Sequence, residues 1–192
     1  MTSEAVSRLE HYRLDTAAST FTVQAFAAGL FSAFGHDPVI GVRKFEGEVA
    51  LVPVTFDDVS LQLRIDAGSL AVVNDLKEKD RREIEQTMRE QVLEIRKYPE
   101  IVFQSSSVSL ARLGEGRYRA RVIGALTLHG VTQNNIWISG EVTMRPDGLR
   151  AKGEFTVKQT DYSIRLVSVA GGTLKIRDEV KGRFDILARR DG

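Results

Sequence analysis

The sequence has 192 residues, of which 42% are hydrophobic and 28% charged, and its 27 basic and 26 acidic side chains leave a net charge of +1. This composition is typical of one soluble domain. No basic cluster points to nucleic acid or an anionic bilayer as partner, and no apolar run approaches the ~18 residues of a membrane span. The absence of cysteine excludes disulfides, thiol nucleophiles and thiolate metal sites.

The first residues predict an N-terminal tail over 1–11. This stretch lacks the basic and apolar regions of a secretory leader, so we expect the protein to be cytoplasmic. Alternation then predicts strands over 12–15 and 20–26, joined by a turn at 16–19, with Phe21 and Val23 on one face.

Residues 27–41 combine three glycines and a proline with large apolar side chains, among them Phe31 and Phe34. Loops are normally polar, so this segment is expected to cover something apolar. Two interpretations stay open, which are a lid or portal over an apolar pocket and a loop that packs on the core.

Two further strands are predicted over 43–53 and 60–70, and then a helix over 77–97. Asp75 and Glu78 have the spacing of a capping box. An apolar stripe at helical spacing predicts a solvated helix that covers a sheet edge or a barrel end along one face; it consists of Ile84, Met88, Val92 and Ile95.

Pro99 is expected to stop this helix, and a strand follows from Ile101. Ile101 and Phe103 lie on one parity of the strand, whereas Val108 and Leu110 lie on the other. This slip predicts a β-bulge at 105–107, a device that curves barrel strands.

Four more strands are predicted over 118–128, 133–145, 149–157 and 180–188, with Trp137 on the outward parity of the second. Residues 161–173 are irregular and form a second candidate rim. These elements together predict a mainly β fold. Residues 12–190 are expected to form a single antiparallel domain of about eight strands with one inserted helix.

The inward faces also contain small residues, which in a closed eight-stranded barrel leave space for one ligand. Glycines in barrel strands also serve bends, and the sequence does not separate the two uses. The small positions are Gly47, Ala120, Gly124, Gly140, Ala151, Gly153, Gly182 and Ala188.

An apolar, elongated space favours a lipid over a sugar or nucleotide. The side chains expected to bind it are Phe21, Val23, Phe31, Phe34, Phe45, Leu63, Ile101, Phe103, Val122, Leu126, Ile138, Phe155, Tyr162, Ile164 and Phe184.

His36 and Asp37 lie in the apolar loop, and an aspartate can orient a histidine as general base. Neighbours in sequence rarely face each other, so contact of His36 with a ligand headgroup or the backbone is favoured over catalysis. Arg165 is a second headgroup candidate, with a plain surface arginine as the alternative. His11 and His129 are isolated, which predicts no metal site.

Several motifs, taken in order, resemble the YceI-like family of polyisoprenoid-binding proteins. They are Tyr12-Arg13-Leu14-Asp15 with Ser19-Thr20-Phe21, the run from Lys97 to Ser105, the run from Gly124 to Thr132, and Asp178-Glu179-Val180. The resemblance covers about residues 12–188. It implies an extended lipocalin-like antiparallel barrel with a helix at one end and a long-chain isoprenoid or similar amphiphile inside, without turnover.

The sequence therefore predicts non-catalytic binding, storage or transport of a long-chain amphiphile, such as a polyisoprenoid, quinone-type or fatty-acyl lipid, and no cofactor. The alternative is an enzyme that acts on a lipid-like substrate through His36. A homodimer through Trp137 is a further prediction.

Overall fold

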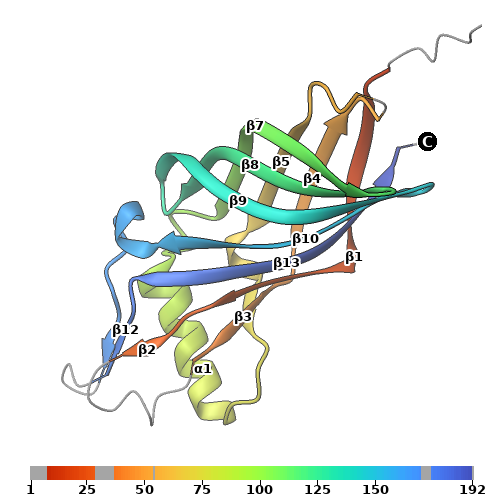
Figure 1. Cartoon of the computed structure of the whole chain (residues 1–192). Coiled ribbons are helices and arrows are strands. Elements are labelled where there is room, and N and C mark those ends of the chain that lie inside the picture. The colour runs from red at the N-terminus through yellow and green to blue at the C-terminus, as the bar shows by residue number, and fades with distance from the viewer. Residues whose placement is uncertain (1–7, 29–36, 54, 170–173, 192) are drawn as a thin grey trace, which may run out of the picture.

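Eight antiparallel strands close into a ring because the first and last of them, β1 and β13, pair with each other (Figure 1). The computed structural model describes residues 8–28, 37–53, 55–169 and 174–191. Around the ring the strands are β1 (Glu10–Gln24), β4 (Phe45–Leu51), β5 (Ser60–Asp66), β7 (Glu100–Gly114), β8 (Arg117–Leu128), β9 (Val131–Arg145), β10 (Gly148–Lys158) and β13 (Glu179–Arg190). The predicted eight-stranded antiparallel barrel with one helix is confirmed.

Strand β1 changes partner halfway along its length. Its first residues pair with β4, whereas Thr22 to Gln24 pair with β3 (Val39–Val42), which in turn pairs with β6 (Leu70–Val72). The change follows a register shift between Asp15 and Thr20, where the Ser19 hydroxyl donates to the Asp15 carbonyl oxygen. The turn predicted at 16–19 is thus wrong, because the strand continues through a bulge that bends it.

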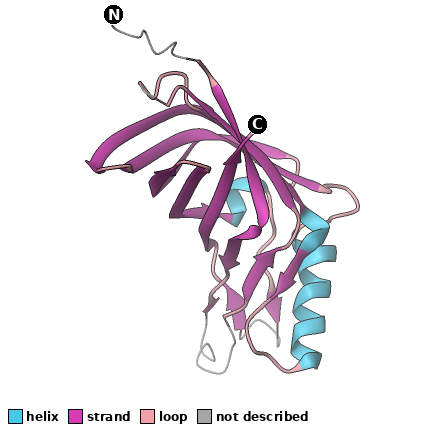
Figure 2. Cartoon of the chain, turned by 90° about the vertical axis from the view of Figure 1, so that its right-hand side faces the viewer, coloured by secondary structure: helices cyan, strands magenta, loops and turns pink. Residues whose placement is uncertain are grey.

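Short elements complete the end of the barrel at which the helix begins, called here the helix end. A small sheet is formed there by β2 (Ala27–Ala28), β11 (Ser168–Val169) and β12 (Leu174–Ile176). Two 3-10 turns, η2 (Ala67–Ser69) and η4 (Gln159–Tyr162), follow β5 and β10. Figure 2 shows the long helix standing beside this end of the barrel.

The helix comprises α1 (Glu78–Thr87) and a π-helical turn, η3 (Met88–Val92). It stops before the predicted residue 97, since Glu94 has a φ of 45° and its carbonyl oxygen accepts from the backbone N–H of Lys97 and Tyr98. The predicted capping box is wrong, because Lys77 is the N-cap and no side chain caps this end. The Glu85 carboxylate instead accepts from the Val72 N–H at 2.9 Å, which fixes the helix to the edge strand β6.

His129 ties the end of the helix to the barrel, although the sequence predicts it as isolated. Its Nε2 lies 2.5 Å from the Glu94 carboxylate and its Nδ1 3.2 Å from the Tyr162 carbonyl oxygen. The ring of Tyr98 lies 4.5 Å from the imidazole, centroid to centroid. The helix, the β8–β9 turn and η4 are therefore joined at one point.

The predicted bulge in β7 is confirmed by a register shift between Ser105 and Ser107. Two serine hydroxyls at the bulge form hydrogen bonds with backbone groups that have no partner in the irregular strand ladder. The Ser105 hydroxyl accepts from the Leu61 N–H at 2.8 Å, and the Ser106 hydroxyl donates to the Ile123 carbonyl oxygen at 3.2 Å. Small hydroxylated residues at this corner thus replace ladder hydrogen bonds.

Three inward glycines make room for aromatic rings rather than for a ligand. A Cβ atom at Gly182 would lie 2.1 Å from the Phe155 ring, one at Gly124 2.5 Å from the Phe103 ring, and one at Gly153 2.6 Å from Phe184. The expectation that these small residues open the cavity is therefore wrong. Each ring covers the glycine of a neighbouring strand.

We predict that Gly182→Ala lowers the free energy of unfolding by about 1–3 kcal/mol, because the new methyl group must displace the Phe155 ring. Gly114→Ala is the matched control, since its Cβ would meet no atom closer than 4.0 Å. Urea unfolding of both variants measures the difference. Equal free energies of unfolding for the two variants would show that the position of the Phe155 ring does not require a glycine at position 182.

Candidate functional site

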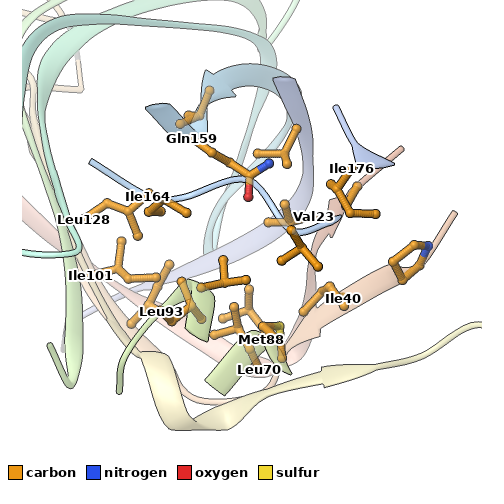
Figure 3. A pocket seen from close by; sticks show the side chains of 18 of the residues that line it. Val23, Ile40, Leu70, Met88, Leu93, Ile101, Leu128, Gln159, Ile164 and Ile176 are labelled. Carbon is orange, nitrogen blue, oxygen red and sulfur yellow. The ribbon is translucent and has the colours of Figure 1, made fainter. Parts of the chain in front are cut away.

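A cavity of about 510 Å³ lies at the helix end of the barrel, between the strands, the helix and η4 (Figure 3). Side chains point into it from all sides. They include Val23 and Ile40 from β1 and β3, Ile101 from β7, Met88 and Leu93 from the end of the helix, and Ile164 after η4. The bend in β1 and the helix packed beside β6 together define this space.

Gln159 is the one buried polar residue among the described residues, with 8% of its surface exposed. Its amide nitrogen donates to the carbonyl oxygens of Arg177 and Asp178, at 2.9 and 3.3 Å. Because these bonds fix the nitrogen, the amide oxygen points into the cavity. The site thus holds a hydrogen-bond acceptor within an otherwise apolar lining.

Asp178 holds the turn that carries Gln159. Its carboxylate accepts from the Thr160 N–H at 2.8 Å and from the Thr160 hydroxyl at 2.6 Å. These hydrogen bonds lower the pKa of Asp178 below its usual value of 3.8. The Asp178-Glu179-Val180 motif therefore includes an anchor for the cavity wall.

Charged and polar side chains gather where the cavity opens. Asp80, Glu83 and Thr87 line it from α1, and Lys175 lines it from β12. Figure 1 places β12 and the first turns of α1 at the same end of the molecule. The cavity therefore has an apolar interior and a polar rim, the arrangement that suits an amphiphile.

A smaller cavity of about 140 Å³ lies at the opposite end of the barrel. Its lining is mainly apolar and includes Leu14, Leu110, Val142 and Ile186. Phe56 and Tyr118 pack against each other at this end, with ring centroids 4.6 Å apart. The barrel interior thus holds a cavity toward each of its ends.

Most of the ligand-binding side chains predicted from the sequence reach one of these spaces. Those that line the larger cavity are Phe21, Val23, Leu63, Ile101, Phe103, Leu126, Ile138, Phe155 and Ile164. Val122 and Phe184 line only the smaller one. The structure brings neither Phe45 nor Tyr162 to a cavity, because both are packed in the core, and burial raises the pKa of Tyr162 to about 12.

The predicted headgroup residues do not meet at the site in the described part of the chain. Arg165 is exposed and lines neither cavity. Phe31, Phe34 and His36 lie outside the described residues. Trp137 is 62% exposed, in agreement with its outward parity, and the homodimer stays a prediction.

Within the described ranges, no three His, Asp or Glu side chains lie close enough to hold a metal ion. None of the described helices has the length and apolar character needed to cross a membrane.

Several residues of the site were not predicted from the sequence. Gln159 follows a strand without a periodic signal, and its role depends on carbonyl groups 18 and 19 residues away. The packing predicted for Met88 and Val92 is confirmed, because Met88 belongs to a core cluster and Val92 packs against it, but both also line the cavity. Periodicity alone does not distinguish a filled core from one that borders open space.

Comparison with known proteins identifies the fold. The model of the YceI-like domain family matches residues 12–188. The crystal structure of Burkholderia cenocepacia BcnA superposes with a TM-score of 0.66 at 20% identity, covering 91% of this chain and 98% of that one. A polyisoprenoid-binding domain from Saccharophagus degradans, implicated in plant cell wall breakdown, gives 0.65 at 16% identity, covering 96% and 100%.

A Campylobacter jejuni YceI protein gives a TM-score of 0.56 at 13% identity, covering 80% of this chain and 84% of its own. No curated protein matches the sequence. At these identities the three structures establish the shared fold.

We predict that Asp178→Asn weakens the attachment of η4 at neutral pH and removes part of the acid sensitivity of the fold. The pKa of Asp178 is lowered in the folded state, so its carboxylate stabilises the protein above its usual pKa, and this contribution is lost as the pH falls through the folded value. In urea unfolding, the stability difference between wild type and variant should therefore be constant above about pH 5 and shrink as the pH falls below 3.8, the usual pKa of the carboxyl group.

Asp161→Asn serves as the control, because Asp161 is an exposed carboxylate in the same turn. Its pH profile is expected to follow that of the wild type. A constant difference between wild type and Asp178→Asn across the pH range would contradict the assigned role.

Proposed function

The chain belongs to the YceI-like domain family, and we propose that it binds, stores or transports a long-chain amphiphile in the larger cavity, without chemical turnover. The observation that carries this proposal is a mainly apolar cavity of about 510 Å³ with charged and polar residues in part of its lining. Cavities of roughly 300–1,000 Å³ are typical of small-molecule sites.

The apolar side chains that line the cavity favour an apolar chain as ligand. A chain in this cavity would contact aliphatic and aromatic side chains from β1, β7, β9 and β10 on one side and from the helix on the other. Burial of apolar surface contributes roughly 25 cal/mol per Å². A polar ligand such as a sugar would leave most of its hydrogen-bonding groups unsatisfied there, which disfavours its binding.

The polar groups suggest an orientation. The charged side chains Asp80, Glu83 and Lys175 line the opening, so the polar end of the ligand would lie toward them and the apolar chain toward Phe103 and Phe155. The Gln159 amide oxygen would accept a hydrogen bond from a hydroxyl or similar donor of the ligand. This favours an alcohol or phenol over a ligand whose polar end only accepts.

The family and the fold support a polyisoprenoid or a similar chain as the ligand. One structure of the same fold is described as a polyisoprenoid-binding domain. The shape of the cavity equally admits a quinone-type or fatty-acyl chain. Binding without turnover is supported by the aliphatic and aromatic character of the deep lining. Catalysis through His36 would show as conversion of the bound ligand that His36→Ala abolishes.

We predict that Met88→Trp weakens the binding of farnesol by at least about tenfold, because the indole would fill the space that the chain needs. Met88 is buried in the core cluster but also lines the cavity, so the indole can extend into that space, and circular dichroism checks that the fold persists. Isothermal titration calorimetry measures the affinity. Gln86→Trp, on the exposed side of the same helix, is the matched control and should bind as the wild type does.

Equal loss of affinity in both variants would mean that the tryptophan acts through the helix rather than through the cavity. Full affinity in Met88→Trp, with a folded protein by circular dichroism, would place the ligand elsewhere and contradict the proposal.

A further inference from the structure

The two cavities share one boundary. Five side chains line both of them, namely Phe21, Leu63, Phe103, Ile138 and Phe155. These residues come from β1, β5, β7, β9 and β10, which are spread around the whole ring rather than along one wall. They therefore form a cross-section of the barrel, called here the partition.

Aromatic rings pack against one another at the partition. Phe21 and Phe155 meet edge to face, with centroids 5.9 Å apart and an interplanar angle of 76°. Phe45 buttresses Phe21 from behind in the same geometry, at 6.1 Å and 82°. Such pairs are favoured over stacked sandwiches.

Cross-strand register fixes where each ring lies. Phe155 pairs with Gly182 and Phe103 lies beside the strand that carries Gly124, so that each ring occupies the space over a glycine. Phe21 pairs with Phe184, and Phe184 in turn covers Gly153. Phe103, Phe155 and Phe184 thus each pack closely against the backbone of a neighbouring strand, which restricts their rotation on that side.

We propose that this partition is the stop for the apolar chain of the ligand, so that Phe21, Phe103 and Phe155 determine the chain length that the protein accepts. The inference rests on the proposed function and refines it. A chain that enters past the polar rim runs along Ile101 and Ile138 until it meets the three rings. Longer chains must leave their last carbons outside or force the rings apart, which costs packing energy.

In this proposal the smaller cavity lies beyond the end of the bound chain. It is the space that a longer chain would enter if the rings were removed, and its lining is already mainly apolar. A single truncation should therefore lengthen the accepted chain rather than only create a void.

The test is a length series of prenyl alcohols, from geraniol through farnesol and geranylgeraniol to longer polyprenols, titrated into the full chain by calorimetry. In the wild type, affinity should rise with length and then level off or fall. Phe155→Ala should move this limit by at least one isoprene unit and improve the affinity of the first excluded alcohol by at least about tenfold, since several more carbons are buried. If the alanine variant does not fold, Phe155→Leu is titrated in its place, and the same shift of the length limit is expected.

Two controls separate the partition from general loosening of the core. Phe56→Ala removes a phenyl ring that packs on Tyr118 at the opposite end of the barrel and lines neither cavity. It should lower stability and leave the length limit unchanged. Ala151→Leu fills the smaller cavity and should restore the wild-type limit when combined with Phe155→Ala.

The outcomes are distinct. If no alcohol binds the wild type, the proposed function fails. If alcohols bind but Phe155→Ala and Phe155→Leu keep the wild-type limit, or if Ala151→Leu alone weakens long alcohols in the wild type, the chain does not stop at the partition and this inference is overturned.

Discussion

The pairing of β1 with β13 is the constraint on which the rest of the structure depends. It joins residues 157 to 178 positions apart and closes the sheet into a ring. Without it, β1 and β13 would be open edges, and the inward side chains would face solvent. The same pairing sets Phe21 opposite Phe184 and Val23 opposite Gly182. The register between β1 and β13 therefore determines both the closure of the barrel and the positions of these aromatic rings.

The larger cavity follows from how the ring is finished at the helix end. There β1 leaves β4 for β3, and the helix is attached to the edge of β6 through Glu85 and to the β8–β9 turn through Glu94 and His129. Held at these two points, the helix presents Met88 and Val92 to the interior without filling it. At the opposite end, the side chains leave a space of only about 140 Å³.

Much of this fold could be predicted from the sequence because period-two alternation reports directly on which residues face inward. The slip in parity after Phe103 even located the bulge at 105–107. The sequence predicts a turn where β1 bends, since Asp15 and Ser19 satisfy backbone groups in both cases. It also leaves open whether the inward glycines make room for a ligand or serve bends. Whether a ring covers Gly182 depends on the register with β10, which one strand alone does not reveal.

The site was less predictable than the fold for the same reason. Gln159 gains its role from carbonyl groups on another segment, and the partition exists only through five strands at once. Whether the larger cavity holds a long-chain amphiphile can be measured by native mass spectrometry of the protein purified from its host, followed by organic extraction. We expect excess mass that extraction identifies as a molecule with a long apolar chain. A protein of bare mass that also takes up no added prenyl alcohol or fatty acid would contradict the proposal.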